Sequence, residues 1–174
     1  MARILSSLTK QFFTSPDELG VFEAVETNDL TESYQALLAH HDHMTVTVEA
    51  WHNSLVDVHV LDEKQHGDSY ARKIVLTLQR GSRPVQFGIM RIDFGGLPEI
   101  VRLEIQSQAL PLGRIMIRHH LMREVELCQL WRVNPGPELR TLLRLKEDVA
   151  IYGRTARILV SGKPAVELLE IVTA

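Results

Sequence analysis

The pattern that most constrains the fold is a strict alternation of side chains over residues 70–79, followed by a tight turn. One face of that run carries Tyr70, Arg72, Ile74, Leu76 and Leu78. The turn Gly81-Ser82-Arg83-Pro84 leads into a second apolar run over residues 85–94. Such alternation predicts a strand with one buried face, and Gly and Pro between two runs favour a β-hairpin. Consecutive hairpins build antiparallel sheets.

Further runs extend this predicted sheet. Residues 152–160 and 165–172 flank the turn Ser161-Gly162-Lys163-Pro164, which predicts a second hairpin. The other predicted strands cover residues 44–49, 56–60 and 124–133. We therefore expect one antiparallel sheet of about six strands.

Helices are predicted before and between these strands. The opening residues 1–13 are expected to form a docked first helix. The alternative is an amphipathic helix that packs on a partner. Ser15-Pro16-Asp17-Glu18 has the pattern of a capping box with proline at the first helical position, and predicts a helix running through Val25. Asp29-Leu30-Thr31-Glu32 predicts a second helix running through Leu38. Short helices are also expected within residues 95–121 and 137–143.

Together these elements predict the α+β class, with helices packed around a single antiparallel sheet. The length of 174 residues suits one domain, with N-terminal helices in residues 1–43 and the sheet core in residues 44–174.

Composition narrows the function. The chain has 19 basic and 22 acidic residues, a net charge of −3, whereas a nucleic-acid-binding domain normally has a basic excess. We expect no nucleic-acid partner. Cys128 is the sole cysteine, which excludes an internal disulfide and suits a reducing compartment. The chain has neither a signal-peptide pattern nor an apolar run of membrane-spanning length, so we expect a cytoplasmic protein.

Two charged residues lie where the pattern predicts buried side chains. Arg72 shares the apolar face of the 70–79 strand, and burying an unpaired guanidinium costs several kcal/mol. Glu170 lies on the apolar face that Leu168 and Val172 define. One interpretation is that Arg72 and Glu170 pair with each other or with neighbours inside the core. The other is a closed pocket that presents both groups to an anionic substrate.

Two other clusters suggest ligand sites. Leu110-Pro111-Leu112-Gly113-Arg114 enters a predicted helix, where Gly113 permits close backbone approach and free N–H groups attract carboxylates. This segment is also compatible with an ordinary helix entry. His40-His41-Asp42-His43 has the residue types of a metal site, but no second group of ligands has supporting spacing. We therefore expect no metal.

The ordered set of these landmarks resembles the chorismate lyase family and its uncharacterised relatives. The resemblance runs from about Met44 to the end. Its landmarks are Ala71-Arg72-Lys73-Ile74-Val75-Leu76, Leu97-Pro98, Leu110-Pro111-Leu112-Gly113-Arg114, Tyr152-Gly153-Arg154 and Ser161-Gly162-Lys163-Pro164, followed by a strand that carries a glutamate.

The resemblance implies an occluded internal site and an activity, the elimination of pyruvate from chorismate to give 4-hydroxybenzoate, with no metal or organic cofactor. It implies that Arg72 binds a carboxylate, that the backbone N–H of Leu112, next to Gly113, helps to hold one, and that Glu170 is the acidic group over the reacting ring. Tyr34 falls near an early contact residue of the family.

Two departures from the family pattern bear on the substrate. Several members carry a second polar residue on the strand after the first hairpin, where this chain has Ile89. Arg91, two residues later on the same face, is the substitute that we expect to bind substrate. Glu167 is a local alternative to Glu170, because a bulge would exchange the faces of the two residues.

Three functions therefore remain open. The first is a carbon–oxygen lyase that acts on chorismate. The second is a non-catalytic module that binds an aromatic carboxylate, because the effector-sensing domains of one family of bacterial transcription regulators are similar in fold to chorismate lyase. The third is a lyase for another enolpyruvyl substrate. Each has a small anionic molecule as its partner, and the sequence does not determine the oligomeric state.

Overall fold

In the computed structural model, which describes residues 2–121, 124–146, 149–160 and 162–174, the strands of these residues form one seven-stranded sheet. Neighbouring strands are antiparallel throughout, in the order β1-β5-β6-β7-β4-β3-β2. The strands are β1 (Gly20–Val25), β2 (Val56–His66), β3 (Ser69–Leu78), β4 (Pro84–Asp93), β5 (Glu124–Pro135), β6 (Ile151–Val160) and β7 (Lys163–Val172). The predicted α+β class with a single antiparallel sheet is confirmed.

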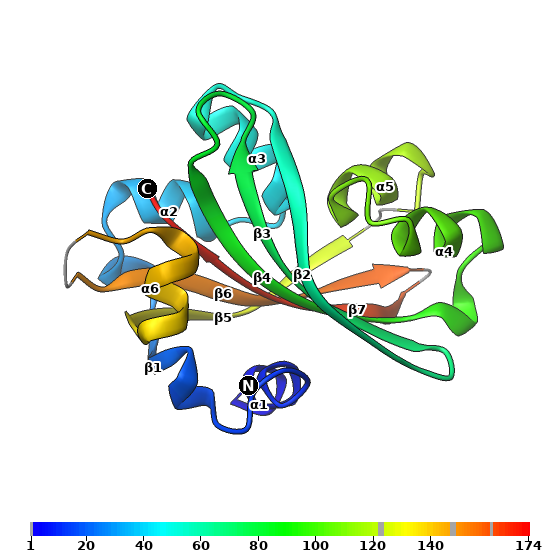
Figure 1. The fold of residues 1–174 in the computed structure, drawn as a ribbon, viewed down its shortest axis with the longest axis horizontal. Helices are drawn as coiled ribbons and strands as arrows, with labels where there is room; N and C mark the ends of the chain where they lie inside the picture. The colour runs from blue at the N-terminus through cyan, green and yellow to red at the C-terminus, as the bar shows by residue number, and fades with distance from the viewer. Residues whose placement is uncertain (1, 122–123, 147–148, 161) are drawn as a thin grey trace.

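Helices cover both faces of the sheet (Figure 1). They are α1 (Ala2–Thr9), α2 (Glu32–Leu38), α3 (Met44–His52), α4 (Glu99–Gln106), α5 (Leu112–Arg118) and α6 (Pro137–Leu143), with single 3-10 turns at Pro16–Glu18, Thr27–Asp29 and Phe94–Gly96. Leu8 of α1 and Leu139 of α6 share a buried cluster with Phe87 and Ile89 on one face. On the other face, α2 and α3 build one cluster, and α4 and α5 build another.

Strand β3 is buried on both faces, because each face has its own helices. Tyr70, Arg72 and Leu76 face the α2–α5 side with at most 1% of each side chain exposed. Ala71 and Val75 are buried on the α1–α6 side. The prediction that Arg72 lies in the core is therefore confirmed.

The helix predicted from Ser15 to Val25 is wrong. The capping contacts do form, since Glu18 Oε1 accepts from the N–H of Ser15 at 2.9 Å, but they close only one 3-10 turn. The chain leaves that turn at Gly20, whose φ of 142° is rarely open to other residues. It continues as edge strand β1, in which Gly20 pairs with Pro135 of β5.

The strand predicted over residues 44–49 is also wrong, because this segment is helix α3. Met44 and Val48 lie one helical turn apart and are both buried, whereas Val46 is 48% exposed. A strand would have placed all three side chains on one face. Most of the other predicted elements form near their predicted places: α1, α2, α6 and strands β2 to β7.

Candidate functional site

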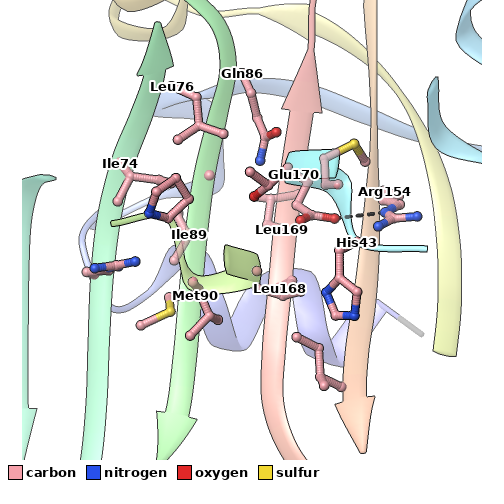
Figure 2. A pocket seen from close by; sticks show the side chains of 18 of the residues that line it. His43, Ile74, Leu76, Gln86, Ile89, Met90, Arg154, Leu168, Leu169 and Glu170 are labelled. Carbon is pink, nitrogen blue, oxygen red and sulfur yellow. Dashed lines mark hydrogen bonds and ion pairs between the residues drawn. The ribbon is translucent and has the colours of Figure 1, made fainter. Parts of the chain in front are cut away.

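A cavity lies between the sheet and the helices of the α2–α5 side. Its floor comes from β3, β4, β7 and β6, and its walls come from the start of α3 and from Pro111, Leu112 and Gly113 at the start of α5. The cavity is small, with a volume of about 40 Å³. Figure 2 shows the side chains that point into it.

Arg72 projects from β3 at this cavity and is fully buried. Its Nη1 donates to the carbonyl of Ile105 at 3.3 Å, and its Nη2 donates to the carbonyl of Leu110 at 3.4 Å. Both distances exceed the usual range of N–H···O hydrogen bonds. Its buried Nε has no hydrogen-bond partner. The guanidinium is therefore weakly satisfied.

Arg72 also lacks an ion-pair partner among the described residues. Within the described ranges, no carboxylate lies within 4 Å of it, since the ion pairs found there involve other residues. Burial lowers the pKa of the Arg72 guanidinium, an effect that the neighbouring Tyr70 hydroxyl and the charge of Glu63 oppose. Because an arginine does not lose its proton in proteins, the group stays charged, with no carboxylate in direct contact among the described residues.

Glu170 faces the cavity from β7 and pairs with Arg154 of β6, as the dashed line in Figure 2 shows. Arg154 Nε donates to Glu170 Oε2 at 2.8 Å, with the arginine fully buried and the glutamate 7% exposed. The other Arg154 nitrogens donate to the carbonyls of His40 at 2.9 Å and Asp42 at 3.0 Å. Arg154 thus connects the segment before α3 to the sheet. Its guanidinium nitrogens all have acceptors, whereas the Nε of Arg72 has none.

Two histidines next to this pair are held in the neutral form. Desolvation by burial, with the nearby charge of Arg154, lowers the pKa of His43 to about 4. The same two causes lower the pKa of His40. His43 lines the cavity, so this wall carries no positive charge from histidine at neutral pH.

The rest of the described lining is apolar apart from the side chains of Gln86 and Thr45. Its apolar lining includes Ile74, Leu76, Met90 and Leu168. Gln86 projects from β4 on the same face, and its Oε1 is buried without a hydrogen-bond partner. The site therefore offers one cation without an ion-pair partner, one paired glutamate and one unused acceptor among mostly apolar walls.

The structure brings together four of the six residues predicted for the site. They are Arg72, Glu170, Leu112 and Gly113, which all line the cavity. Glu170, and not Glu167, faces it. Arg72 and Glu170 do not pair with each other. Glu170 instead pairs with a neighbour inside the core, Arg154, which is the other form of the core-pair interpretation.

Arg91 and Tyr34 lie elsewhere. Arg91 shares a face with Ile89, as predicted, but that face is turned towards α1 and α6, because successive strand residues point to opposite sides. There Arg91 forms an ion pair with Glu167. Tyr34 of α2 packs on Tyr152, with ring centroids 4.7 Å apart. Neither residue is placed for the substrate contact predicted for it.

Sequence reasoning missed Arg154, Gln86 and His43. The pattern that identified Arg72 also applies to Arg154, because Arg154 shares a strand face with Ala156 and Ile158, which are both buried. Gln86 shares a face with Met90 in the same way. His43 precedes residues 44–49, which were predicted as a strand, so no pattern indicated that its side chain would line a cavity.

Within the part of the chain that the structure describes, no three His, Cys, Asp or Glu side chains are grouped as metal ligands. No helix there is long and apolar enough to span a bilayer.

Comparison with known proteins bears on the fold. No family model and no curated protein matches the sequence. Among solved structures, PhnF from Mycobacterium smegmatis has a TM-score of 0.58 at 8% identity, over 98% of this chain and 94% of that chain. The ligand-binding domain of a protein assigned to the GntR family of transcriptional regulators, from Bordetella bronchiseptica, has a TM-score of 0.52 at 14% identity, over 68% and 85% of the two chains.

A third similar structure is the C-terminal domain of the histidine utilization repressor from Pseudomonas syringae pv. tomato, with a TM-score of 0.50 at 11% identity, over 68% of this chain and 92% of that chain. None of these structures is named a chorismate lyase. Identities this low establish the arrangement of strands and helices. The chain therefore has the chorismate lyase-like fold that is also found in ligand-binding domains of GntR-family regulators.

Proposed function

We propose that this protein binds a small organic acid in the internal cavity, with Arg72 as the group that neutralises its carboxylate. The observation that carries the proposal is the full burial of a guanidinium that has only two long contacts to carbonyls. A guanidinium presents a planar fork of donors that matches a carboxylate, and the buried Nε of Arg72 is unused.

The fold supports binding more than it supports a particular reaction. A solved structure of similar fold is described as a ligand-binding domain. The apolar walls suit an aromatic or aliphatic body attached to the carboxylate. Met44 and Met90, which line the cavity, have unbranched side chains that adapt to a ligand larger than the present space.

Calorimetric titration with benzoate tests the proposal, with Arg72→Met as the principal variant. We expect the wild-type protein to bind benzoate and Arg72→Met to lose at least roughly tenfold in affinity, because a buried hydrogen-bonded ion pair is lost. Arg91→Met is the matched control. It removes the same side chain from the opposite face of the sheet, and we expect it to bind like the wild type. Equal binding by wild type and Arg72→Met contradicts the proposal.

A second candidate function is the lyase reaction on chorismate. It is favoured by the position of Glu170, which faces the same cavity as Arg72, where the resemblance placed an acidic group. A carboxyl group there could move a proton as the ring becomes aromatic. The test is the appearance of pyruvate and 4-hydroxybenzoate from chorismate, and the loss of both products with Glu170→Gln. Benzoate binding without turnover leaves binding as the function.

A further inference from the structure

The charged groups that line the cavity do not balance. The described lining contains two positively charged groups, the guanidinium groups of Arg72 and Arg154, and one carboxylate, that of Glu170. The remaining titratable group of the lining is His43. His43 is neutral, because burial and Arg154 hold its pKa near 4. The fixed charge of the cavity is therefore +1.

The negative charge near Arg72 lies outside the cavity lining. Glu63 lies opposite Arg72 on β2, accepts a hydrogen bond from the Tyr70 hydroxyl at 2.6 Å and favours the charged form of Arg72, but it does not line the cavity. Glu49, near the cavity wall, is already paired with Arg114. Asp42 contributes a backbone carbonyl to Arg154, and its side chain lies in an exposed position.

An enclosure with few polar groups penalises any net charge left inside it. Buried ions are tolerated when they are paired, and an unpaired one costs several kcal/mol. A ligand with charge −1 brings the charge of the occupied cavity to zero. A neutral ligand leaves Arg72 without an ion-pair partner, and a doubly charged ligand introduces a second carboxylate for which no cation remains, since Arg154 is committed to Glu170.

We propose that the cavity selects singly charged acids and discriminates against both their neutral analogues and dianions of the same shape. This inference rests on the proposed function and adds the charge class of the ligand. It disfavours chorismate as the ligand, because chorismate carries two carboxylates.

Ligand pairs of equal shape test the inference in the wild-type protein at neutral pH. Terephthalate and 4-carbamoylbenzoate differ only in the exchange of one carboxylate for an uncharged amide. Succinate and succinamate form a smaller pair of the same kind. Benzoate with benzamide compares a monoanion with its neutral analogue. In calorimetric titrations, we expect the monoanion of each pair to bind roughly tenfold tighter or more.

The variant Glu170→Gln tests the same charge argument by changing the charge of the protein instead of that of the ligand. It keeps the size of the side chain and raises the fixed charge of the cavity from +1 to +2. We expect the preference for monoanions over dianions to fall by roughly tenfold or more. If this variant does not fold, the ligand pairs alone decide the question.

The outcomes separate the inference from the proposed function. If the acids bind through Arg72 but a dianion binds as tightly as its monoanionic partner, the charge selection is wrong and binding remains. If benzoate binds but neither member of the terephthalate pair or of the succinate pair does, the cavity rejects a second polar group whatever its charge, which also contradicts the inference. If no acid binds, the proposed function fails first.

Discussion

Two arginines are buried in the part of the chain that the structure describes, Arg72 and Arg154, and their roles differ. Arg154 is surrounded by the carboxylate of Glu170 and by backbone carbonyls of the segment before α3, so its burial is compensated. Arg72 has two long contacts to carbonyls and a bare Nε. Alternation in the sequence identifies both as buried cations. It does not tell which one is satisfied, because the acceptors come from residues far away in the chain.

Removing Arg72 should leave the empty protein at least as stable. We expect Arg72→Met to unfold in urea with an unchanged free energy, or with one higher by about 1–3 kcal/mol, because an unpaired buried charge is replaced by an apolar side chain of similar length. Arg154→Met is the contrasting variant. It should lower the free energy of unfolding by about 3–5 kcal/mol, because it leaves the buried Glu170 without its cation. A large loss with Arg72→Met would mean that the guanidinium supports the core.

His43 should make the protein sensitive to acid. Its pKa is about 4 in the folded protein, where burial disfavours the charged form, and near 6.5 in the unfolded chain. The unfolded state therefore binds more protons between these values, and stability falls as the pH drops from about 6.5 to about 4. Allowing for partial exposure, the loss is roughly 1–2 kcal/mol.

Urea unfolding at a series of pH values measures this loss. In His43→Asn, the part of the acid-side loss that comes from His43 should disappear. His66→Asn, which changes an exposed histidine of β2, is the control and should keep the wild-type profile. Identical profiles for wild type and His43→Asn would contradict the assignment.

At the scale of elements, the alternation of side chains predicts the strands of the two hairpins correctly but mispredicts residues 44–49. The runs that form β3, β4, β6 and β7 have regular alternation and turn residues at both ends, so local sequence determines them. Residues 44–49 alternate equally well, yet they form helix α3. β-branched residues at this place favoured a strand, but packing of Met44 and Val48 against the sheet decides the outcome.

Strand β1 shows the opposite error. The capping contacts around Ser15 and Glu18 are local and real, so the start of a helix was predicted correctly in its details. What ends it is the pairing of Gly20 with Pro135, a residue more than 100 positions away. Sequence patterns carry no information about such distant partners.

A substitution at Gly153 tests how closely β6 and β7 must approach each other to keep the ion pair between Arg154 and Glu170. A Cβ at this position would lie 2.6 Å from the carbonyl oxygen of Glu170 and 2.9 Å from Cγ1 of Ile171. We expect Gly153→Ala to push the strands apart next to Arg154, to lower stability by about 1–3 kcal/mol and to weaken benzoate binding. Gly96→Ala is the control, because a Cβ there meets nothing within 4 Å. Unchanged melting and binding would show that the strands adapt freely.

At the scale of the whole molecule, the sheet separates a supporting face from a binding face. Leu8 of α1 is fully buried in the cluster on the α1–α6 face, away from the cavity. The sequence predicted the docked first helix and the buried Arg72, but it did not assign α1 and the cavity to opposite faces. That assignment follows from the order of strands, which depends on contacts between distant segments.

Leu8→Ala should therefore lower stability without changing benzoate affinity, whereas Arg72→Met should lower benzoate affinity without lowering stability. We expect a loss of about 2–4 kcal/mol in the free energy of unfolding, because a buried leucine is truncated. Benzoate affinity should stay at the wild-type value at temperatures where the protein is folded. Leu103→Ala on α4, where the side chain is 57% exposed, is the control and should change neither quantity. A parallel loss of affinity in Leu8→Ala would show that the two faces are coupled.

The place of β7 in the sheet has a consequence for how the protein is made. The last of the described strands in chain order is the one that joins β6 to β4, so β1, β5 and β6 on one side and β2, β3 and β4 on the other are hydrogen-bonded into one sheet only through it. Until β7 leaves the ribosome, two open strand edges stay unpaired, and such edges invite contact with other chains. Glu170 also arrives with this strand, so the nascent chain completes its cavity and pairs these two inner edges in the same step.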